Sequence, residues 1–567
     1  MKNSAFTFKI LGLSIILSSS LALAGTWTYP GCKDVTDADF ESIPLITRGL
    51  APDKNLVEPD KMDFDMDAAG NVDIYFTEIR PGNIKRYNGA TKTVKTLVKL
   101  PNWGLGSDYR SVPNSRHTEE GVTGIVLDPN FKTNHFIYVH WSPLPDTLDV
   151  FRISRFTVTG DTILMSSEKI ILQFPAQREE CCHTGGSMAF DDYGDLWIAQ
   201  GANGGRGPAG QPNGIDEVVK YRSEEWGAAS TQSLRGSILR IHPDNSAKGY
   251  SIPEGNFGAY FAKQTGDTKY LDVNKVAPEV YIKGIRNNYS LAVDPVRRWV
   301  AWGDVGPDIG VPADREEMNL RKTPGFEGWP YFVGKNKPFN GNKDAGLPKN
   351  NSKWNLGLVD LPPARPTTYL PNMGSSPITG PIYRYNGALN SSVKLPPHFN
   401  RKWFVTDFTT DGVKVLTLND AGDSVIKSEV FPNTDVHGPV DFRVGPDGAL
   451  YISNYGKVYF GGDDNTSIIR ISYKGDCRPA TPLLEKATVG NMDRNRSESI
   501  QNANQSLSAW TKFALRQNLY VPQGMKEIQL YDLSGKKVWE NSHLQSGDFL
   551  QMPDRLSNGS YWVKWTK

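Results

Sequence analysis

The sequence lacks the signatures of several common protein classes. It has only four cysteines in 567 residues, with neither a C-x-x-C-H motif nor a C-x₂-C pair, so covalent c-type haem and structural zinc are not indicated. A charge excess is also missing, because 63 Lys and Arg stand against 62 Asp and Glu. That balance gives no reason to expect nucleic acid or an anionic membrane as a partner. Residues 201–207 are glycine-rich, but no βαβ unit follows them, which argues against NAD.

Long apolar runs are missing too, except at the N-terminus. There, Lys2 and Lys9 flank a polar start, and L-G-L-S-I-I-L-S-S-S-L-A-L-A follows and ends in the small-x-small pattern Ala22-Leu23-Ala24. This pattern predicts a signal peptide over residues 1–24 and therefore an exported protein. A membrane anchor is the alternative, and it is disfavoured because the run is shorter than the ~20 residues that a span needs. No other segment has the composition of a transmembrane segment.

What the sequence does contain is one short pattern that occurs six times. Most copies read as an apolar strand, a turn rich in Asp, Pro, Asn or Gly, and a second apolar strand; they begin at Asp63, Gly124, Met188, Leu291, Lys402 and Asp441. Such a hairpin is the centre of a four-stranded blade, so the repeats predict an all-β protein with a six-bladed β-propeller. The longest insertion, roughly residues 325–381, is rich in Pro, Gly, Asn and Lys and predicts extended loops.

The domain organisation follows from these repeats and from a change in composition near the C-terminus. We expect a lead-in segment at 25–54, the propeller at 55–480, a polar linker at 481–508 and a small C-terminal β-sandwich at 509–567. The pieces I-Q-L-Y-D-L-S-G-K and L-S-N-G-S-Y-W-V-K resemble the C-terminal sorting domains with which some Gram-negative bacteria send proteins across the outer membrane. The resemblance implies a periplasmic, extracellular or cell-surface protein and outer-membrane secretion machinery as a partner. A generic accessory sandwich is the alternative.

The four cysteines fall into two groups. Cys32 and Cys477 lie near the two ends of the propeller region, where a bridge would staple a ring whose ends must meet. We expect this pairing, since export makes disulfides possible. It would leave Cys181 and Cys182, which are adjacent, either as free thiols or as a vicinal disulfide.

Three polar clusters stand at the ends of the third and fourth repeats. His183 lies in E-E-C-C-H-T-G-G, directly before the third repeat, and Arg286-Asn287 lies in K-G-I-R-N-N, in the same position before the fourth. Equivalent loops of neighbouring blades converge, so these side chains should share one space. The third cluster, G-D-V-G-P-D from Gly303, offers the carbonyls of Gly306 and Pro307 and the carboxylate of Asp308, which suit Ca²⁺. A structural histidine, a salt-bridged arginine and a simple turn are the alternatives.

Together these clusters resemble the soluble quinoprotein sugar dehydrogenases of the glucose/sorbosone dehydrogenase family. The matching segments run in order across all six repeats: E-E-G-V-T-G-I-V-L-D-P-N-F from Glu119, H-T-G-G-S-M-A-F-D-D-Y-G-D-L-W-I from His183, G-S-I-L-R-I-H-P-D from Gly236, G-I-R-N-N-Y-S-L-A-V-D-P from Gly284, E-E-M-N-L from Glu316, G-F-E-G-W-P from Gly325 and P-V-D-F-R-V-G-P-D-G-A-L-Y-I-S from Pro439. The resemblance implies a propeller that holds pyrroloquinoline quinone (PQQ) over its mouth.

The resemblance also implies a role for each matching residue. His183 would be the general base on the sugar C1 hydroxyl, with hydride passing to the quinone C5. Arg286 would stabilise negative charge on the quinone oxygen, with Asn287 beside it. The carbonyls of Gly306 and Pro307 would hold Ca²⁺, and Glu119 would line the sugar pocket. The sequence does not indicate the electron acceptor.

The sequence departs from the family at several of these positions. A Gly-Asp step that orients the histidine reads Gly201-Ala202 here, so a carboxylate is missing unless Asn203 or another group substitutes. The family's lysine is absent from T-T-D-G at 409–412, and its two arginine positions hold Gly438 and Val440, with His437 adjacent. PQQ carries three carboxylates, so the loss of these cations would weaken its binding.

We therefore expect an exported oxidoreductase that oxidises an aldose or a related sugar or polyol with PQQ and Ca²⁺. The alternative is a non-catalytic secreted propeller that binds carbohydrate or a cell-surface partner, which the missing carboxylate and cations favour. A hydrolase or lyase propeller is a third reading, but no serine-based or paired-carboxylate arrangement supports it.

Overall fold

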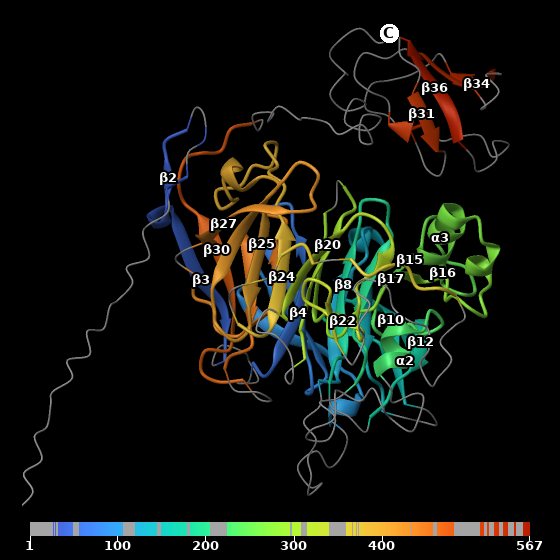
Figure 1. Cartoon of the computed structure of the whole chain (residues 1–567). Coiled ribbons are helices and arrows are strands. Elements are labelled where there is room, and N and C mark those ends of the chain that lie inside the picture. The colour runs from blue at the N-terminus through green and yellow to red at the C-terminus, as the bar shows by residue number, and fades with distance from the viewer. Residues whose placement is uncertain are drawn as a thin grey trace, which may run out of the picture. The chain divides into compact units, whose positions relative to one another are not determined.

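The computed structural model describes most of the propeller region and the strands of a C-terminal unit. The residues that it describes are 26–27, 29, 32–48, 56–105, 119–144, 149–178, 182–204, 224–294, 297–307, 315–339, 359–365, 367–369, 371, 374–431, 434–457, 462–480, 511–514, 519–520, 527–531, 537–541, 549–550 and 560–566. The chain divides into two compact units, Met1–Leu483 and Leu484–Lys567 (Figure 1).

The first unit contains six sheets that follow one another along the chain, and their strands pair antiparallel except for β17 with β21. The first three are β4–β7 (Pro59–Met66, Val72–Glu78, Asn83–Asn88, Thr93–Lys99), β8–β12 (Val122–Leu127, Phe136–Trp141, Val150–Thr159, Thr162–Ile163, Lys169–Pro175) and β13–β17 with β21 (Gly185–Phe190, Leu196–Gln200, Ser237–Pro243, Tyr250–Ser251, Val280–Lys283, Gly325–Phe326). The others are β18–β20 (Ser290–Val293, Val300–Asp304, Glu317–Arg321), β24–β27 (Pro377–Ile382, Trp403–Asp407, Val413–Leu418, Val425–Phe431) and β28–β30 with β3 (Pro439–Val444, Leu450–Asn454, Ser467–Tyr473, Phe40–Thr47).

Short elements decorate these sheets. The α-helices in the described residues are α1 (Phe131–Asn134), α2 (Glu224–Ala229) and α3 (Phe257–Thr265). Two small strand pairs are β1 with β2 (Thr26–Trp27, Val35–Thr36) and β22 with β23 (Phe332–Val333, Lys337–Pro338). Within this described part of the chain, none of the helices has the length and hydrophobicity of a membrane span.

The six sheets close into a ring. The first strand of each sheet contacts the first strand of the next, in the order β4, β8, β13, β18, β24 and β28, and β28 contacts β4 again. The prediction of an all-β, six-bladed propeller is confirmed. The last blade is built from both ends of this unit, because β3 pairs antiparallel with β30, with Ser42 opposite Ile471 (Figure 1). Residues 40–47, which we had assigned to a lead-in segment, thus form the outer strand of the sixth blade.

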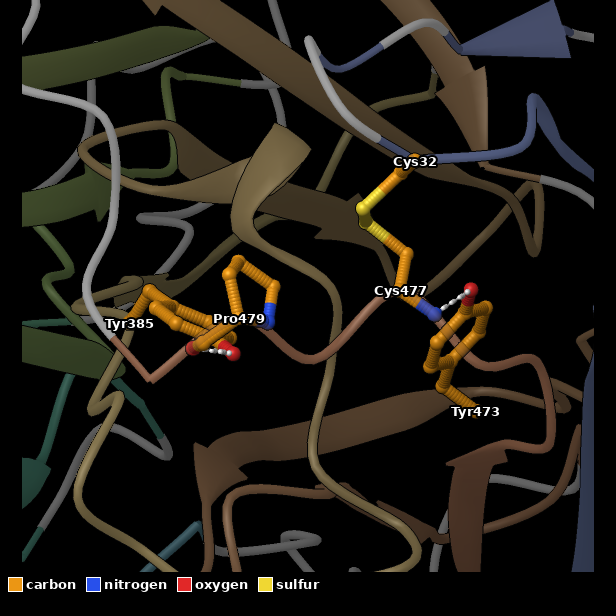
Figure 2. The surroundings of a disulfide bond; sticks show 5 residues. All are labelled: Cys32, Tyr385, Tyr473, Cys477 and Pro479. Atoms are coloured by element: carbon orange, nitrogen blue, oxygen red, sulfur yellow. Dashed lines mark hydrogen bonds between the residues drawn. A yellow bond between two sulfur atoms is a disulfide. The ribbon is translucent and has the colours of Figure 1, made fainter.

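The predicted disulfide joins the same two ends. Cys32 and Cys477 are bonded, with their Cα atoms 5.3 Å apart across a sequence separation of 445 (Figure 2). Next to the bridge, the Cys477 N–H donates to the Tyr473 hydroxyl at 3.1 Å, and the Tyr385 hydroxyl donates to the Pro479 carbonyl at 2.7 Å. The pairing that we expected is confirmed.

The fifth repeat is displaced by one strand from its expected role. The other repeats coincide with the first and second strands of their blades, but K-W-F-V-T-D-F-T-T-D-G-V-K-V-L-T-L covers β25 and β26, the second and third. The first strand, β24, lies inside the stretch that we assigned to the long insertion. It was missed because residues 383–402 separate it from β25, so the two do not form a short hairpin.

The middle strands are buried on both faces, since each blade packs between two others. In β29, Leu450 and Ile452 join the apolar core shared with the fifth blade, whereas Tyr451 joins the core shared with the first. In β14, Leu196 and Ile198 face one side, and Trp197 and Ala199 face the other. This is the alternation of a strand with an apolar layer on either side, and it explains why the repeats read as continuous apolar runs.

The second unit is also built of strands where it is described. A four-stranded sheet has the order β31 (Thr511–Ala514), β36 (Ser560–Thr566), β33 (Glu527–Tyr531) and β34 (Lys537–Asn541). A separate pair joins β32 (Leu519–Tyr520) to β35 (Phe549–Leu550). The resemblance of this unit to sorting domains remains a prediction, and residues 1–24, the predicted signal peptide, lie outside the described residues.

Candidate functional site

One end of the propeller gathers a loop from every blade. Each loop stands just before the first strand of its blade; the residues at these positions are Glu58, Glu119, His183, Arg286, Ser376 and His437. Backbone hydrogen bonds tie each loop to the end of its second strand, as from Asn203 N–H to the His183 carbonyl at 2.9 Å and from Val305 N–H to the Asn287 carbonyl at 3.2 Å. The fold therefore presents six equivalent loops around one mouth.

The mouth contains a cavity with mainly apolar and aromatic walls. Its volume is about 710 Å³, including the space that is open to solvent. Five of the six blades contribute to the lining, among them through Glu119, Asn287, Tyr289, Phe408, Val440 and Tyr455. A flat ring system with polar edges would find both aromatic surface and a few hydrogen-bonding groups in this space.

His183 is buried on the loop of blade three, and two hydrogen bonds to carboxylates hold it there. Its backbone is in the left-handed region, with φ at 64°, and its N–H donates to Glu119 Oε2 at 2.8 Å. Its ring Nδ1 is hydrogen-bonded to Glu224 Oε1. A carboxylate only accepts hydrogen bonds, so this pairing places a proton on Nδ1 and leaves Nε2 as the basic nitrogen.

Glu224 was not anticipated from the sequence. It is the first residue of α2 and its side chain is fully buried. We had named Asn203 as the residue that could take the place of the missing aspartate, but its side-chain Oδ1 accepts from the Gln177 N–H at 2.7 Å and from Arg235 Nη1 at 3.2 Å. Ala202 packs with Ala228, Trp329 and Val333 in an apolar cluster. The carboxylate on His183 thus comes from a different part of the chain.

Arg286 and Asn287 stand on the neighbouring loop, fixed by Asp304. The Asp304 carboxylate accepts the backbone N–H of Arg286 at 3.1 Å and that of Asn287 at 2.6 Å, and burial raises its pKa to about 6. The Arg286 carbonyl accepts from the Ala202 N–H at 2.8 Å, which joins the loops of the third and fourth blades. The structure therefore brings together the His183 and Arg286 loops.

Several polar atoms of this loop have no partner within the described residues. Nε and Nη2 of Arg286 and Oδ1 of Asn287 are buried without a hydrogen bond. Asn287 lines the aromatic cavity, and Arg286 lines a second, small pocket with Gly306 and Trp329. Buried polar groups are normally paired, so the unpaired donors of Arg286 indicate a place for a ligand with acceptor atoms. This observation fits the carbonyl and carboxylate oxygens of a quinone cofactor such as PQQ.

The residues expected to hold Ca²⁺ fit that ion less well. The Gly306 carbonyl accepts from Arg286 Nη1 at 3.0 Å, and the Val305 carbonyl accepts from the same nitrogen at 2.9 Å. Pro307 lies beside Gly306 in a small pocket, whereas Asp308 lies outside the described residues. In the part of the chain that the structure describes, no group of three or more His, Cys, Asp or Glu side chains could hold a metal ion.

The opposite side of the mouth, formed by blades five and six, has a different character. His437 is half-buried and its Nε2 is hydrogen-bonded to Asp435 Oδ1, on its own loop, at 2.7 Å. Gly438 has a φ of +55°, and a Cβ at this position would lie 2.2 Å from the Gly456 carbonyl oxygen, so a side chain is excluded there. Neither position 438 nor Val440 supplies the positive charge that the family resemblance led us to look for.

Two lysines nevertheless lie in this region, Lys457 after β29 of blade six and Lys61 in β4 of blade one. Lys457 Nζ donates to Asp411 Oδ1 at 2.6 Å and to the Thr409 carbonyl at 3.2 Å, next to the T-T-D-G loop. Lys61 Nζ donates to the Val440 carbonyl at 2.9 Å and lies 3.7 Å from the centre of the Tyr289 ring. Lys61 is fully buried and paired with Asp60, whose pKa burial raises to about 6. These cations are already paired with carboxylates.

The two adjacent cysteines lie just before His183. Cys182 is disulfide-bonded. Cys181 lies outside the described residues, so a bond between these neighbours stays a prediction.

Comparison with known proteins accounts for this arrangement of blades and loops. The sequence model of the family described as Glucose / Sorbosone dehydrogenase matches residues 59–458. The chain belongs to the glucose/sorbosone dehydrogenase family. The matched residues cover most of the propeller, from its first strand β4 to the loop after β29.

Characterised relatives are distant in sequence. The chain is 24% identical to the aldose sugar dehydrogenase YliI of Escherichia coli over 351 residues, which are 62% of this chain and 78% of that protein. It is 23% identical to the quinoprotein glucose dehydrogenase B of Acinetobacter calcoaceticus over 271 residues, 46% of this chain and 48% of that protein.

A solved structure shows the same fold. The soluble aldose sugar dehydrogenase from Escherichia coli in its apo-form aligns over 76% of this chain and 99% of that chain, with 19% identity and a TM-score of 0.50.

Proposed function

We propose that this glucose/sorbosone dehydrogenase-family protein is an exported PQQ-dependent dehydrogenase of an aldose or a related sugar or polyol. The proposal rests mainly on one observation: Arg286 and Asn287, neighbours on one loop, have buried polar atoms without a partner in the described residues, and Asn287 lines the cavity with aromatic walls. The loop that holds them is joined to the loop of a buried histidine whose Nδ1 is already committed to a carboxylate. A protein that only binds carbohydrate has no evident need for that combination.

Each residue has a distinct task in this proposal. PQQ, when bound, supplies the two-electron acceptor for the sugar's C1 hydrogen. His183 Nε2 accepts the proton of the C1 hydroxyl, because Nδ1 is occupied by Glu224. Arg286 would supply a positive charge next to the cavity residue Asn287 and stabilise the negative charge that develops on the quinone. Glu119 lines the cavity and accepts the His183 N–H, so it is placed to meet the sugar next to the base.

Calcium rests on the family resemblance alone. Gly306 and Pro307 are the residues that would hold the ion, but the Gly306 carbonyl accepts a hydrogen bond from Arg286 here. We therefore derive no step through Ca²⁺. A PQQ titration in the presence and absence of Ca²⁺ tests whether PQQ binding depends on calcium. If it does not, the Arg286 guanidinium occupies the Gly306 carbonyl in place of the ion.

Export and secretion complete the proposal. The N-terminal signal-like sequence and the disulfide between Cys32 and Cys477 both support passage into an oxidising compartment. The C-terminal unit, whose sequence resembles sorting domains, would then engage outer-membrane secretion machinery. Cell fractionation tests this assignment. The full chain is expected at the cell surface or in the medium, and a chain without residues 509–567 is expected to accumulate in the periplasm.

A non-catalytic, carbohydrate-binding propeller is the second candidate. The observation that favours it is that the two lysines described at this side of the mouth, Lys457 of blade six and Lys61 of blade one, both have carboxylate partners. Such a protein would bind sugars with the same mouth but would not bind PQQ tightly.

Reconstitution tests both candidates. The purified protein is titrated with PQQ, with Ca²⁺ or with EDTA, and a panel of aldoses and polyols is then added while the quinone absorbance is followed. Stoichiometric PQQ binding and bleaching by one sugar are expected. Failure to bind micromolar PQQ under either condition would refute the dehydrogenase proposal, and direct glycan-binding measurements would then test the second candidate.

A further inference from the structure

Glu224, whose carboxylate contacts His183, is buried in an arrangement that is unfavourable for stability. Glu224 and His183 have side chains that are 0% and 4% exposed, and Glu224 Oε2 is buried without a hydrogen-bond partner in the described residues. Burying a carboxylate with half of its acceptor capacity unused costs stability, and a buried ion pair seldom repays that cost. The arrangement is therefore poorly explained as a device for holding the fold together.

The surrounding backbone is shaped to admit this carboxylate. A Cβ at Gly204 would lie 1.9 Å from Glu224 Cγ, so only glycine leaves room for the glutamate to reach the ring. At Gly201, a Cβ would lie 2.1 Å from the His183 carbonyl oxygen. Both glycines flank Ala202 on the strand-end loop, which lets the His183 loop and α2 approach each other closely.

The helix that carries Glu224 is itself anchored to the site. The buried Lys283 Nζ donates to the carbonyls of Gly227 at 2.9 Å and Arg235 at 2.6 Å, which fixes the end of α2. Arg235 in turn lies over the Trp226 ring, 5.4 Å from its centre, and its Nη1 donates to Asn203 Oδ1 at 3.2 Å. These contacts hold α2 against the same 201–203 loop that hydrogen-bonds to His183 and Arg286.

We propose that Glu224 is the positioning residue for His183, and that it replaces, from a separate helix, the carboxylate absent at Ala202. Glu224 accepts a hydrogen bond from Nδ1–H, which fixes the tautomer and the ring orientation and keeps Nε2 free to take a proton from the substrate. An imidazolium formed at His183 during the reaction is stabilised by the same carboxylate. This inference rests on the proposed function, in which His183 is the base.

The first test needs neither cofactor nor substrate. In the protein labelled with ¹⁵N-histidine, the His183 Nδ1–H signal is identified by its loss in His183→Asn. Glu224→Gln is expected to remove this downfield signal or to shift the tautomer toward Nε2–H. Glu225→Gln is the matched control, since Glu225 is the next residue of α2, is also buried, and accepts from the Tyr331 hydroxyl at 3.0 Å. An unchanged Nδ1–H signal in Glu224→Gln would overturn the proposal.

The second test addresses catalysis. With PQQ bound, Glu224→Gln is expected to lower kcat at least about tenfold, with KM and the PQQ dissociation constant little changed, as for other residues that orient a functional histidine. Glu225→Gln should retain wild-type kcat. If Glu224→Gln does not fold, Glu224→Asp takes its place in the test. It keeps the negative charge but moves it away from the His183 ring, so a shifted Nδ1–H signal and a reduced kcat are expected.

The two proposals fail in different ways. If wild-type protein binds no PQQ, the proposed function fails, while the Nδ1–H signal still decides whether Glu224 holds His183. If PQQ binds and turns over but Glu224→Gln has wild-type kcat and an unchanged Nδ1–H signal, only the role of Glu224 is wrong.

Discussion

The two halves of the propeller mouth, formed by blades three and four and by blades five and six, differ in the charged side chains that they present and in how those side chains are paired. On the loops of blades three and four, His183 is hydrogen-bonded to Glu224, and the backbone around Arg286 is fixed by Asp304, yet Arg286 Nε and Nη2 have no partner among the residues that the structure describes. On blades five and six, the walls are Phe408, Val440 and Tyr455, and the nearby lysines are paired with carboxylates. In the described residues, the polar groups proposed for proton transfer are therefore on blades three and four, whereas blades five and six do not carry the cations that the family resemblance led us to expect.

The largest change is expected when the reactive half loses its histidine. His183→Asn should lower turnover by roughly 10² to 10⁴, the range typical of a general base, and should leave PQQ binding largely intact. Steady-state kinetics and a PQQ titration measure the two effects separately. His242→Asn is a control, because His242 is half-exposed and hydrogen-bonded to Asp195 away from the cavity lining. A fully active His183→Asn would remove the proposed distinction between the halves.

A smaller loss is expected at Arg286. Arg286→Gln removes the charge while keeping a side chain of similar reach, and a charge-assisted hydrogen bond contributes about 1.5–3 kcal/mol. PQQ affinity and turnover should therefore both fall, by roughly 10- to 100-fold, and Arg286→Lys should fall between Gln and wild type because it retains the charge without the planar fork. Wild-type binding by Arg286→Gln would show that its unpaired nitrogens do not contact the cofactor.

The other half can be tested by adding charge. Val440→Arg places a guanidinium in the cavity wall and is expected to tighten PQQ binding by about tenfold, since Arg–carboxylate contacts are among the stronger hydrogen bonds. Val440→Met adds length without charge and should not tighten binding. If Val440→Arg leaves the affinity unchanged, the cofactor carboxylates do not lie against blade six.

The smallest effect concerns stability and involves the mouth loop of blade two. Burial raises the pKa of Glu120 from 4.5 to about 7, although Arg178 Nε lies 3.2 Å from its Oε2. The protonated form is favoured in the folded state, so its contribution to stability is complete below pH 4.5 and is lost as the pH rises through 7.

Glu120→Gln removes this titration. Between pH 5 and pH 8, the Tm of the wild type should fall more than that of Glu120→Gln, by a few degrees at most. Thermal unfolding at both pH values measures the change in Tm for each protein. Equal changes in the wild type and in Glu120→Gln would show that Glu120 is not the group that titrates.

Much of the fold could be predicted because the information is local. Five of the six repeats are first-and-second-strand hairpins that can be seen within a short window of sequence. The strand β3 could not be assigned in this way, since its partner β30 lies at the other end of the propeller region and no local pattern records the pairing. The fifth blade was misread because the inserted residues 383–402 break its first hairpin.

The site shows the same division between local and distant information. His183 and Arg286 stand in motifs beside recognisable strands, so their loops could be placed at one mouth. Glu224 follows His183 by 41 residues and heads a short helix, where an acidic residue is common for reasons unrelated to any ligand. Lys61 lies in β4 of the first blade and meets Val440 of the sixth only because the ring closes, and Lys457, after β29 of the sixth blade, contacts the loop of the fifth.

The closure of the sixth blade also sets when folding can finish. The outer strand β3 is synthesised before all the other blade strands. Its partner β30 and Cys477, which bonds to Cys32 across 445 residues, come at the opposite end of the ring. A chain threaded through a membrane pore with its N-terminus leading therefore cannot complete this ring until nearly the whole propeller has crossed. If the protein is exported as proposed, the ring and its disulfide between Cys32 and Cys477 can therefore be completed only on the far side of the membrane.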